Sequence, residues 1–274
     1  MAPVSDRARR AGVLGSPIAH SRSPQLHLAA YRALGLNDWT YERIECTGEQ
    51  LPSVVREFGP EWVGVSVTMP GKFAALRFAD HATARATLVG SANTLVRSPR
   101  GWQADNTDID GVVGALAGVA ATEHALVVGS GGTAPAVVVG LAELGARHIT
   151  VAARNPEKAA PLVELATRCG ARSQWCDIAD RRLADATAEV DIVVNTVPAS
   201  AVAPYAPKLA STPVLLDAIY DPWPTPLAAT VRQAGGTVIS GLLMLLNQAF
   251  AQVEQFTGLP APREAMVAAL NTDH

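Results

Sequence analysis

Residues 66–72 read Ser-Val-Thr-Met-Pro-Gly-Lys and end on a side chain that can move a proton. Lysine is scarce in this chain, which has only three among its 22 basic residues, and Lys72 is the first side chain after a predicted turn at residues 69–71. Surroundings can lower the pKa of a lysine until it exchanges a proton, whereas an arginine stays charged. Taken alone, Lys72 is best interpreted as a solvated loop lysine; acid–base catalysis becomes the better interpretation together with the Asp-Asn-Thr-Asp segment at 105–108 and the glycine pattern described below.

An acid and a pair of hydroxyls stand at two predicted helix starts. Asp108 opens a predicted helix over residues 108–116, where the helix dipole favours an acid with or without a function. Ser21 and Ser23 precede Pro24, a pattern that predicts Ser23 as the N-cap and Pro24 as the first helical residue. Because a helix N-terminus attracts anions, the two hydroxyls are also candidates to hold a substrate carboxylate.

A glycine pattern further along the chain has the context of a dinucleotide-binding loop. Gly129, Gly131 and Ala134 stand in the spacing G-x-G-x-x-A, directly after a predicted strand over 125–128 and at the start of a predicted helix over 133–144. The first glycine permits a tight turn, and the second lets the backbone approach a pyrophosphate at the helix N-terminus. A plain glycine loop between strand and helix is the alternative.

The residues after the next predicted strand, 148–153, indicate which dinucleotide binds. NAD-binding domains usually carry an acid there for the ribose 2′-hydroxyl, but this chain has Ala153, Arg154 and Asn155, with Lys158 nearby. A carboxylate would repel a 2′-phosphate, whereas a guanidinium can bind it with two hydrogen bonds. The pattern favours NADP, with a solvated loop arginine as the alternative.

These candidates lie on two stretches in which strand and helix signals alternate. The first stretch has predicted strands at 11–15, 40–44, 62–67, 93–97 and 101–105, the last two as a hairpin, and predicted helices at 24–34, 49–58 and 108–116. The second has predicted strands at 125–128, 148–153, 191–196, 214–220 and 237–240, with helices between them and further helices at 242–256 and 262–270. Such alternation argues for parallel sheets covered on both faces, in two domains.

Composition narrows the classes of partner. A formal charge of −3 gives no electrostatic reason to expect nucleic acid or an acidic membrane, and no apolar run reaches the roughly 18–20 residues of a spanning helix. The three cysteines, Cys46, Cys169 and Cys176, form no Cys-x-x-Cys pair and fit reduced thiols in the cytoplasm. The histidines show no metal-binding spacing along the chain, so no metal site is expected.

Eight segments in order resemble the signature blocks of the shikimate dehydrogenase family. They are GSPIAHSRSP, SVTMPGK, SANTLV, ADNTDIDG, GSGGTAPA, ARNPEKA, DAIYDPWPTPL and GLLMLLNQAF, and the resemblance as a whole runs from about residue 12 to residue 257. The resemblance implies reduction of 3-dehydroshikimate to shikimate with NADPH. It also implies an α/β fold with a mostly parallel substrate domain (1–107 plus 243–274) and a Rossmann-type NADP domain (108–242), the C-terminal helices returning to the first domain.

The resemblance also implies roles for individual residues. Ser21 and Ser23 would bind the substrate carboxylate, and Lys72 and Asp108 would form the catalytic pair. Further substrate contacts would come from Thr68, Asn93, Tyr220 and Gln248. The cofactor would be bound by Gly129, Ser130, Gly131, Gly132 and Thr133 at the pyrophosphate, by Ala153, Arg154, Asn155 and Lys158 around the 2′-phosphate, and by the backbone of Ala218 and Gly241 near the nicotinamide.

The chain departs from the usual family pattern at several positions. Ser66 stands where an asparagine is usual, and Gly71 where phenylalanine or histidine precedes the lysine; both departures leave Lys72 in place. The usual Asn-Arg-Thr triad is Ala-Arg-Asn at 153–155, which leaves Arg154 to carry most of the 2′-phosphate recognition. The usual Asn-Ala-Thr block is replaced by NTVPAS at 195–200.

Three alternatives remain at this point. A quinate dehydrogenase of broader substrate and cofactor range would usually carry an acid near Arg154. A folate-linked methylene dehydrogenase would carry Tyr-x-x-x-Lys, but Thr68 stands four residues before Lys72, and no lysine of the chain has that tyrosine. A catalytically inactive NADP-binding regulator is disfavoured by the intact Lys72, Asp108 and Gln248. A monomer and a homodimer are both compatible with the sequence.

Overall fold

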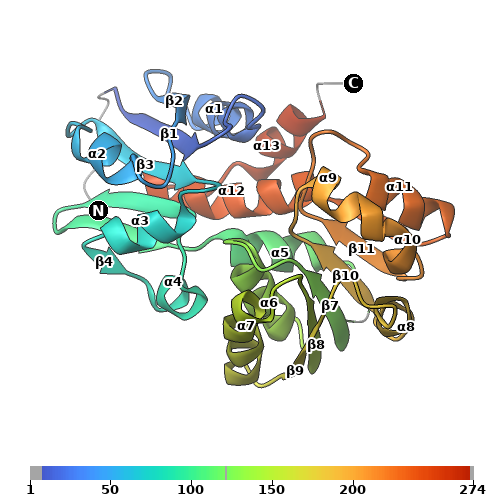
Figure 1. The fold of residues 1–274 in the computed structure, drawn as a ribbon. Helices are drawn as coiled ribbons and strands as arrows, with labels where there is room; N and C mark the ends of the chain where they lie inside the picture. The colour runs from blue at the N-terminus through green and yellow to red at the C-terminus, as the bar shows by residue number, and fades with distance from the viewer. Residues whose placement is uncertain (1–7, 121, 272–274) are drawn as a thin grey trace. The chain divides into compact units, whose positions relative to one another are not determined.

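The computed structural model of the protein describes residues 8–120 and 122–271, which fall into two compact units (Figure 1). Unit 1 combines the chain up to Thr107 with the chain from Leu245 onward, and unit 2 runs from Asp108 to Met244. No helix in the described part of the chain combines the length and the apolar character needed to cross a membrane.

Unit 1 is built on a six-stranded sheet with the order β2-β1-β3-β5-β6-β4. Its strands are β1 (Arg10–Gly15), β2 (Thr40–Glu45), β3 (Trp62–Val67), β4 (His81–Ala82), β5 (Thr94–Ser98) and β6 (Gly101–Asp105). β1 pairs in parallel with β2 and β3, whereas β5 runs antiparallel to β3 and to β6. The predicted hairpin is confirmed, and it brings the start of β5 and the end of β6 to the edge where β1 and β3 end.

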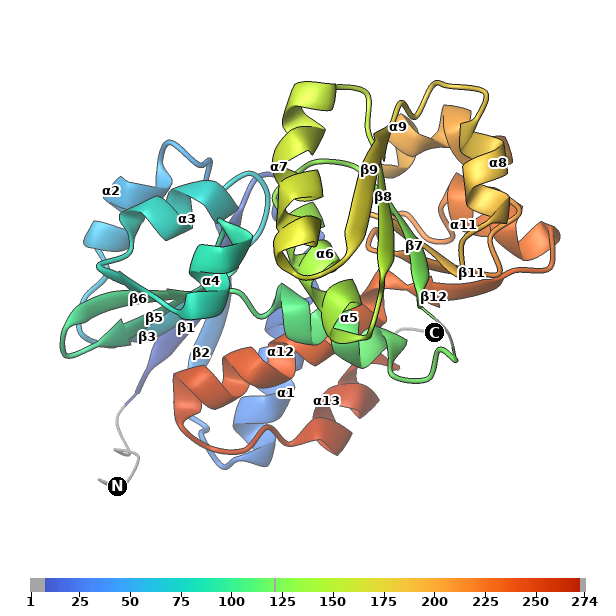
Figure 2. The same ribbon diagram turned by 90° about the horizontal axis from the view of Figure 1, so that it is seen from below.

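Helices cover both faces of this sheet (Figure 2). They are α1 (Ser23–Ala33), α2 (Leu51–Arg56), α3 (Lys72–Phe78), α4 (Ala84–Val89), α12 (Gly241–Thr257) and α13 (Arg263–Leu270). On one face Leu51 and Val55 of α2 pack with Ala75 of α3 and the sheet. On the other face Tyr31 of α1 and Phe256 of α12 belong to one buried cluster. The division between the two units falls within α12.

Unit 2 is a six-stranded, all-parallel sheet with the order β12-β11-β10-β7-β8-β9. Its strands are β7 (His124–Val128), β8 (His148–Ala152), β9 (Arg172–Cys176), β10 (Ile192–Asn195), β11 (Val214–Asp217) and β12 (Thr237–Ser240). Counted along the chain this is the order 6-5-4-1-2-3 of a doubly wound dinucleotide-binding sheet. The Rossmann-type fold expected for this part of the chain is confirmed.

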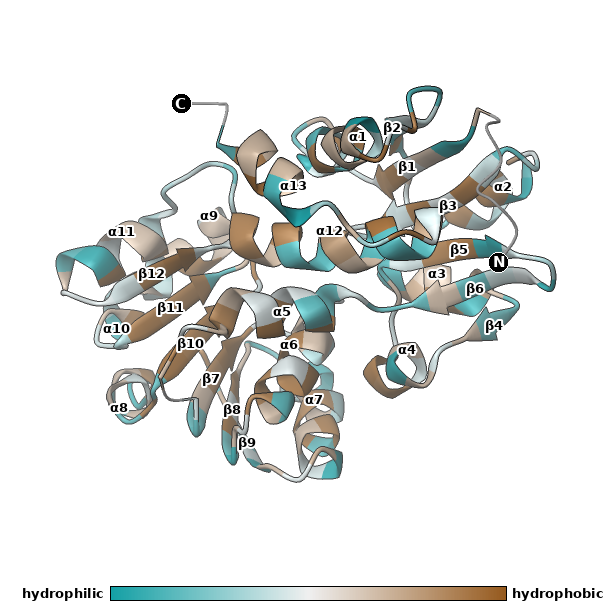
Figure 3. Cartoon of the chain, turned by 180° about the vertical axis from the view of Figure 1, so that it is seen from behind, coloured by the Kyte–Doolittle hydropathy of each residue, from teal (hydrophilic) through white to brown (hydrophobic). Residues whose placement is uncertain are grey.

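Helices flank both faces of the unit 2 sheet, and the central strands are apolar. The helices are α5 (Asp108–Leu116), α6 (Ala134–Glu143), α7 (Pro156–Arg168), α8 (Leu183–Ala188), α9 (Ala199–Val202), α10 (Ala206–Leu209) and α11 (Pro226–Gln233), with a 3-10 turn η1 (Ala203–Tyr205). Figure 3 shows β10 and β11 as continuous hydrophobic bands. Strands covered on both faces carry such runs because neither face meets water.

Several sequence predictions of local structure are wrong or incomplete. The predicted strand 214–220 ends at Asp217, because the Asp217 carboxylate accepts a hydrogen bond from the Ile219 amide (3.2 Å) and turns the chain. The edge strand β9 was not predicted, since its sequence Arg-Ser-Gln-Trp-Cys lacks an apolar run. α3, β4 and α4 were also missed, although Thr83 caps α4 by accepting from the Ala86 amide (3.2 Å).

Candidate active site

Four of the predicted substrate or catalytic residues belong to one edge of the unit 1 sheet. Ser21 follows the end of β1, and Thr68 and Lys72 follow the end of β3. Asn93 immediately precedes β5, whose start lies at this same edge because β5 is antiparallel to β3. In sheets with parallel strands, ligands bind outside the carboxyl ends of the strands, so this edge is the expected place for a substrate.

A buried group of hydrogen bonds is centred on the side chain of Asn93. Its Nδ2 donates to Thr107 Oγ1 (2.9 Å) and to Gln248 Oε1 (3.2 Å), while its Oδ1 accepts from the Thr107 amide (2.8 Å). Gln248 Nε2 in turn donates to the Leu245 carbonyl (2.9 Å). Asn93 and Gln248, predicted separately, are therefore in contact. Thr107 is not among the predicted site residues, although its position directly before Asp108 was a usable signal.

Lys72 and Asp108 are both buried, with 6% and 5% of their surfaces exposed. Lys72 is the first residue of α3, and its carbonyl accepts from the Ala92 amide (3.0 Å), next to Asn93. Asp108 is the first residue of α5 and follows Thr107 directly. Lysine is almost never this buried without a partner, so the interpretation of Lys72 as a solvated loop residue is wrong.

The loop that carries Ser21 and Ser23 is held from within unit 1. The Arg43 guanidinium donates twice to the Ser21 carbonyl (2.8 and 2.6 Å), and Ser21 Oγ accepts from the Ser23 amide (3.3 Å). The prediction of Ser23 as the N-cap is wrong, because α1 begins at Ser23 and Arg22 occupies the cap position without a side-chain cap hydrogen bond. The turn is made by the Ser21 hydroxyl instead, and both serines are buried.

A second polar layer lies behind the Asn93 group and was not predicted. Tyr41 Oη donates to Ser66 Oγ (2.6 Å), and Ser66 Oγ donates to Gln252 Oε1 (2.7 Å). Gln252 Nε2 donates to the Asn93 carbonyl (3.2 Å) and to Thr94 Oγ1 (2.9 Å). The available signal was the spacing, since Gln252 stands one helical turn after Gln248 in α12.

The imidazole ring of His27 packs beside this layer and is neutral. His27 is fully buried and stacks on Tyr41, with ring centroids 4.0 Å apart and planes at 15°. Burial lowers the pKa of His27 to about 3, and burial likewise raises the pKa of Tyr41. Both side chains are therefore uncharged at neutral pH. His27 packs behind the polar layer, and Tyr41 contributes a neutral hydroxyl to it.

In unit 2 the glycine-rich loop lies between β7 and α6, at the point where β8 and β10 flank β7. Gly129 has φ +110°, and a Cβ there would lie 2.5 Å from Thr196 Oγ1 and 2.8 Å from Val197 Cγ1, so only glycine fits. A Cβ on Gly131 would meet no atom within 4 Å. Contacts within the protein therefore do not require glycine at position 131, whereas close approach of a ligand phosphate to the backbone would require it.

The remaining members of this loop continue toward α6. Ser130, Gly132 and Thr133 are half-buried, and Thr133 occupies the N-cap position of α6 without a side-chain cap hydrogen bond. The amides of the first helical turn point out of such a helix end and attract a phosphate.

The loop after β8 exposes one arginine, Arg154, whose guanidinium could bind an anion. Ala153 is buried, whereas Arg154, Asn155 and Lys158 are exposed. Asn155 caps α7, its Oδ1 accepting from the amides of Glu157 (2.8 Å) and Lys158 (3.1 Å), which leaves its amide nitrogen as a donor. Among the described residues Arg154 makes no hydrogen bond or ion pair, so its guanidinium is available to an anion.

Ala218 and Gly241 are in backbone contact. A Cβ on Gly241 would collide with the Ala218 carbonyl and lie 2.8 Å from the Asp217 carbonyl oxygen, so a side chain is excluded there. Asp217 is buried, and burial raises the pKa of its carboxyl group. The hydrogen bonds that it accepts from Thr225 (2.5 Å) and Asn195 (2.9 Å) lower this pKa, but by less than burial raises it. Tyr220, half-buried, lies in the loop after β11 and not in the strand itself.

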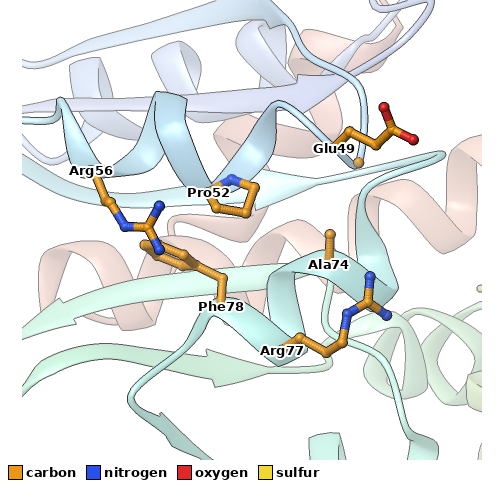
Figure 4. Close-up of a pocket in the computed structure, with 7 residues that line it drawn as sticks. Glu49, Pro52, Arg56, Ala74, Arg77 and Phe78 are labelled. Carbon is orange, nitrogen blue, oxygen red and sulfur yellow. The ribbon is translucent and has the colours of Figure 1, made fainter.

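A hollow of about 340 Å³ opens elsewhere on unit 1, between α2 and α3 (Figure 4). In Figure 4 the Arg56 side chain lies beside the Phe78 ring, and its guanidinium carbon is 5.7 Å from the ring centroid. The lining residues are Gly48, Glu49, Pro52, Arg56, Ala74, Arg77 and Phe78. None of the predicted substrate or cofactor residues is among them, so this hollow is separate from the candidate site.

Comparison with sequence models of protein families matches three parts of the chain. Residues 13–95 match the shikimate dehydrogenase substrate binding domain, and residues 114–204 match the shikimate / quinate 5-dehydrogenase family. Residues 241–270 match the shikimate 5′-dehydrogenase C-terminal domain.

Whole-chain relatives agree with these matches. A shikimate dehydrogenase (NADP(+)) of Methylobacterium radiotolerans is 39% identical over 271 residues, covering 93% of each chain. The crystal structure of Mycobacterium tuberculosis shikimate dehydrogenase is 73% identical, with a TM-score of 0.91, and covers 96% of this chain and 98% of that one. Shikimate 5-dehydrogenase of Thermus thermophilus, in complex with NADP(H) and shikimate, is 29% identical, with a TM-score of 0.80 and coverage of 95% and 98%. The chain therefore belongs to the shikimate dehydrogenase family.

Proposed function

We propose that this protein is an NADP-dependent oxidoreductase acting on a CH–OH group, which reversibly reduces 3-dehydroshikimate to shikimate with NADPH in chorismate and aromatic amino acid biosynthesis. The arrangement around Asn93 carries the proposal. Asn93 is bonded to Thr107 and Gln248, the amide before it donates to the Lys72 carbonyl, and Asp108 follows Thr107. The Asn93 side chain thus joins two residues of the proposed site, while its chain neighbour Ala92 contacts the main chain of Lys72.

Lys72 is the proposed proton donor. NADPH, when bound, supplies the hydride to the carbonyl carbon of 3-dehydroshikimate. Negative charge then grows on the carbonyl oxygen, and the Lys72 ammonium, through Nζ, donates the proton that neutralises it and takes the proton back in the reverse direction. The Asp108 carboxylate orients that ammonium or a substrate hydroxyl. An arginine at position 72 would supply charge but could not transfer the proton.

The substrate is held by hydroxyl and amide groups. Ser21 and Ser23 hydrogen-bond the carboxylate, in a loop that Arg43 already holds by the Ser21 carbonyl. The other proposed contacts to substrate hydroxyls or to the reacting end are Thr68, Asn93, Tyr220 and Gln248. The side chains of Asn93 and Gln248 are held in place before the substrate binds, since each is already hydrogen-bonded within the protein.

The cofactor is held by unit 2. The backbone of 129–133 and the α6 N-terminus bind the pyrophosphate, and Gly131 leaves the space that this contact needs. Arg154 binds the 2′-phosphate, with Asn155 as a donor and Lys158 as a more distant charge. The backbone of Ala218 and Gly241 would contact the nicotinamide.

The proposed functional domains are 1–107 with 243–274 for the substrate and 108–242 for NADP. The division of the chain at Thr107 and Met244 supports this assignment. We place the protein in the cytoplasm, because its three cysteines are free thiols. We further propose that it acts on a small-molecule substrate as a monomer or a homodimer.

The test is the initial rate of NADPH formation with shikimate and NADP, repeated with quinate and with NAD. We expect the highest kcat/KM for the pair shikimate and NADP. Equal or better turnover of quinate with NAD would instead establish the broader quinate/shikimate dehydrogenase. Tight NADP binding without turnover of either acid would establish an inactive NADP-binding regulator.

A further inference from the structure

Two histidines and a glutamate meet at the edge of the unit 2 sheet opposite the glycine-rich loop. His124 begins β7 and His148 begins β8, and the parallel register pairs these two residues directly. Glu123 immediately precedes His124. The Gly129 loop follows the other end of β7, so the cluster is separated from the proposed cofactor site by the length of the strand.

The three side chains have the geometry of a partly formed metal site. The imidazole rings of His124 and His148 stack, with centroids 4.4 Å apart and planes at 14°. One ligand atom from each histidine and one Glu123 carboxylate oxygen all lie within 4.8 Å of one another. A tetrahedral Zn²⁺ with bonds of about 2.0–2.2 Å holds its ligand atoms roughly 3.3–3.6 Å apart, which small side-chain rotations would reach.

One buried nitrogen atom of this cluster lacks a hydrogen-bond partner among the described residues. Nδ1 of His148 is shielded from solvent and has no hydrogen-bond partner in the part of the chain that the structure describes. A buried polar atom without a partner is unfavourable and calls for an explanation such as an ion. Neutral imidazole nitrogen is the commonest protein ligand of transition metals.

The backbone holds these positions in place without a metal. The Glu123 carbonyl accepts from the amides of Arg147 (2.9 Å) and His148 (3.0 Å). The Asp191 carboxylate accepts from the His124 amide (2.9 Å). A metal ion would therefore bind to side chains on an ordered backbone and would not need to order a loop.

We propose that Glu123, His124 and His148 bind one divalent transition metal ion of the Zn²⁺ type, which fastens β7 to β8 and takes no part in the reaction. Two imidazoles and one carboxylate suit Zn²⁺ or Co²⁺ and leave the fourth position to water. The exposed Arg147 and the neighbouring Arg172 oppose a cation, which limits the affinity without removing a ligand. Spacing along the chain could not indicate this site, because it is made by strand pairing.

The experiment is titration of the full-length, tag-free protein with ZnCl₂ by isothermal calorimetry. We expect one saturable site, and a rise in Tm of about 5–10 °C when Zn²⁺ stands at a hundredfold excess over Kd. CoCl₂ should give the intense visible absorption of four-coordinate Co²⁺. His124→Ala and His148→Ala should each weaken Zn²⁺ binding at least tenfold and abolish the Co²⁺ band.

His81→Ala is the matched control, because His81 is exposed on β4 of unit 1 and should not affect either signal. The two cluster variants should keep the shikimate kcat of the metal-free enzyme, whatever that kcat is, so the result does not depend on the proposed function. The proposal is overturned if ZnCl₂ binds with the same affinity after both substitutions, if no saturable binding occurs below millimolar Zn²⁺, or if removal of the metal abolishes turnover.

Discussion

Asn93 holds Thr107 by both ends of its side-chain amide. Nδ2 donates to the Thr107 hydroxyl at 2.9 Å, and Oδ1 accepts from the Thr107 main-chain amide at 2.8 Å. Because Asp108 is the next residue, the position of its main chain depends on this pair. The same amide bonds to Gln248, so one side chain sets two of the proposed contacts.

Asn93→Ala should lower both stability and activity. The buried Thr107 amide would lose its partner, which costs about 1–3 kcal/mol for an unsatisfied buried group, whereas Gln248 Oε1 keeps the Thr107 hydroxyl as a donor (3.3 Å). We expect at least a tenfold fall in kcat/KM for shikimate, measured with urea unfolding on the same preparation. Thr107→Ser keeps both hydrogen bonds and is the control. A stable Asn93→Ala enzyme with unchanged kcat/KM would contradict the role given to this pair.

Lys72→Ala should lower kcat by on the order of 10²-fold or more, the usual range for a lost acid–base group. KM for shikimate should change little if Lys72 acts on the transition state. Lys72→Arg should keep the charge without restoring kcat, while Lys208→Ala, in unit 2, should behave as wild type. A near-normal kcat in Lys72→Ala would remove the proton-donor role.

Ser21→Ala and Ser23→Ala should mainly raise KM for shikimate. A hydrogen bond to a charged group contributes about 1.5–3 kcal/mol, or roughly 10- to 150-fold in binding. Ser23 caps no helix, but its side chain hydrogen-bonds to buried Tyr41, so Ser23→Ala should lower Tm slightly. Ser21→Ala should also lower Tm, because it removes the acceptor of the Ser23 amide. Ser53→Ala, at an exposed position of α2, is the control. A change in Tm with no change in KM would restrict both serines to a structural role.

Arg154→Ala should weaken NADP binding by about 1.5–3 kcal/mol, or roughly 10- to 150-fold, because its exposed guanidinium is the proposed charged contact to the 2′-phosphate. NAD lacks that phosphate, so its kcat/KM should fall far less. The NADP penalty should shrink at high salt, which screens an exposed pair. Lys158→Ala is the matched control and should have a smaller effect. Equal losses for NADP and NAD would place Arg154 at the adenosine, and an unaffected NADP value would place the 2′-phosphate elsewhere.

Stability should fall in mild acid because His27 is buried in its neutral form. Its pKa is about 3 in the folded protein against an ordinary value of 6.5, so between these values the unfolded chain binds one more proton. The free energy of unfolding should therefore lose up to about 1.4 kcal/mol per pH unit as pH falls below 6.5. Urea midpoints between pH 7.5 and 5, where carboxylates stay mostly ionised, measure this slope. His27→Phe keeps a stacked ring on Tyr41 without a proton, and its slope should be clearly smaller; identical slopes would mean that another group titrates.

Local patterns in the sequence determined the elements and the chemistry of individual side chains. The apolar run at 62–67 is β3 with the predicted bounds, and the glycine spacing at 129–134 forms the predicted strand–loop–helix unit. Both signals depend on neighbours a few residues apart, through burial of a strand and through the backbone freedom of glycine. The preference for lysine at position 72 and for arginine at position 154 also follows from side-chain chemistry alone.

Only the tertiary structure decided which of these residues meet. Three contacts join segments that are far apart in the chain. They are the hydrogen bond from Asn93 to Gln248, the hydrogen bond from Ser66 to Gln252, and the strand pairing of His124 with His148. Such contacts depend on strand register and on the packing of α12, which set every side chain's partner at once and have no trace in local spacing. The end of β11 was predicted three residues too late for the same reason. The Ile219 amide donates to the Asp217 side chain and not to a neighbouring strand, and this contact forms only in the folded chain.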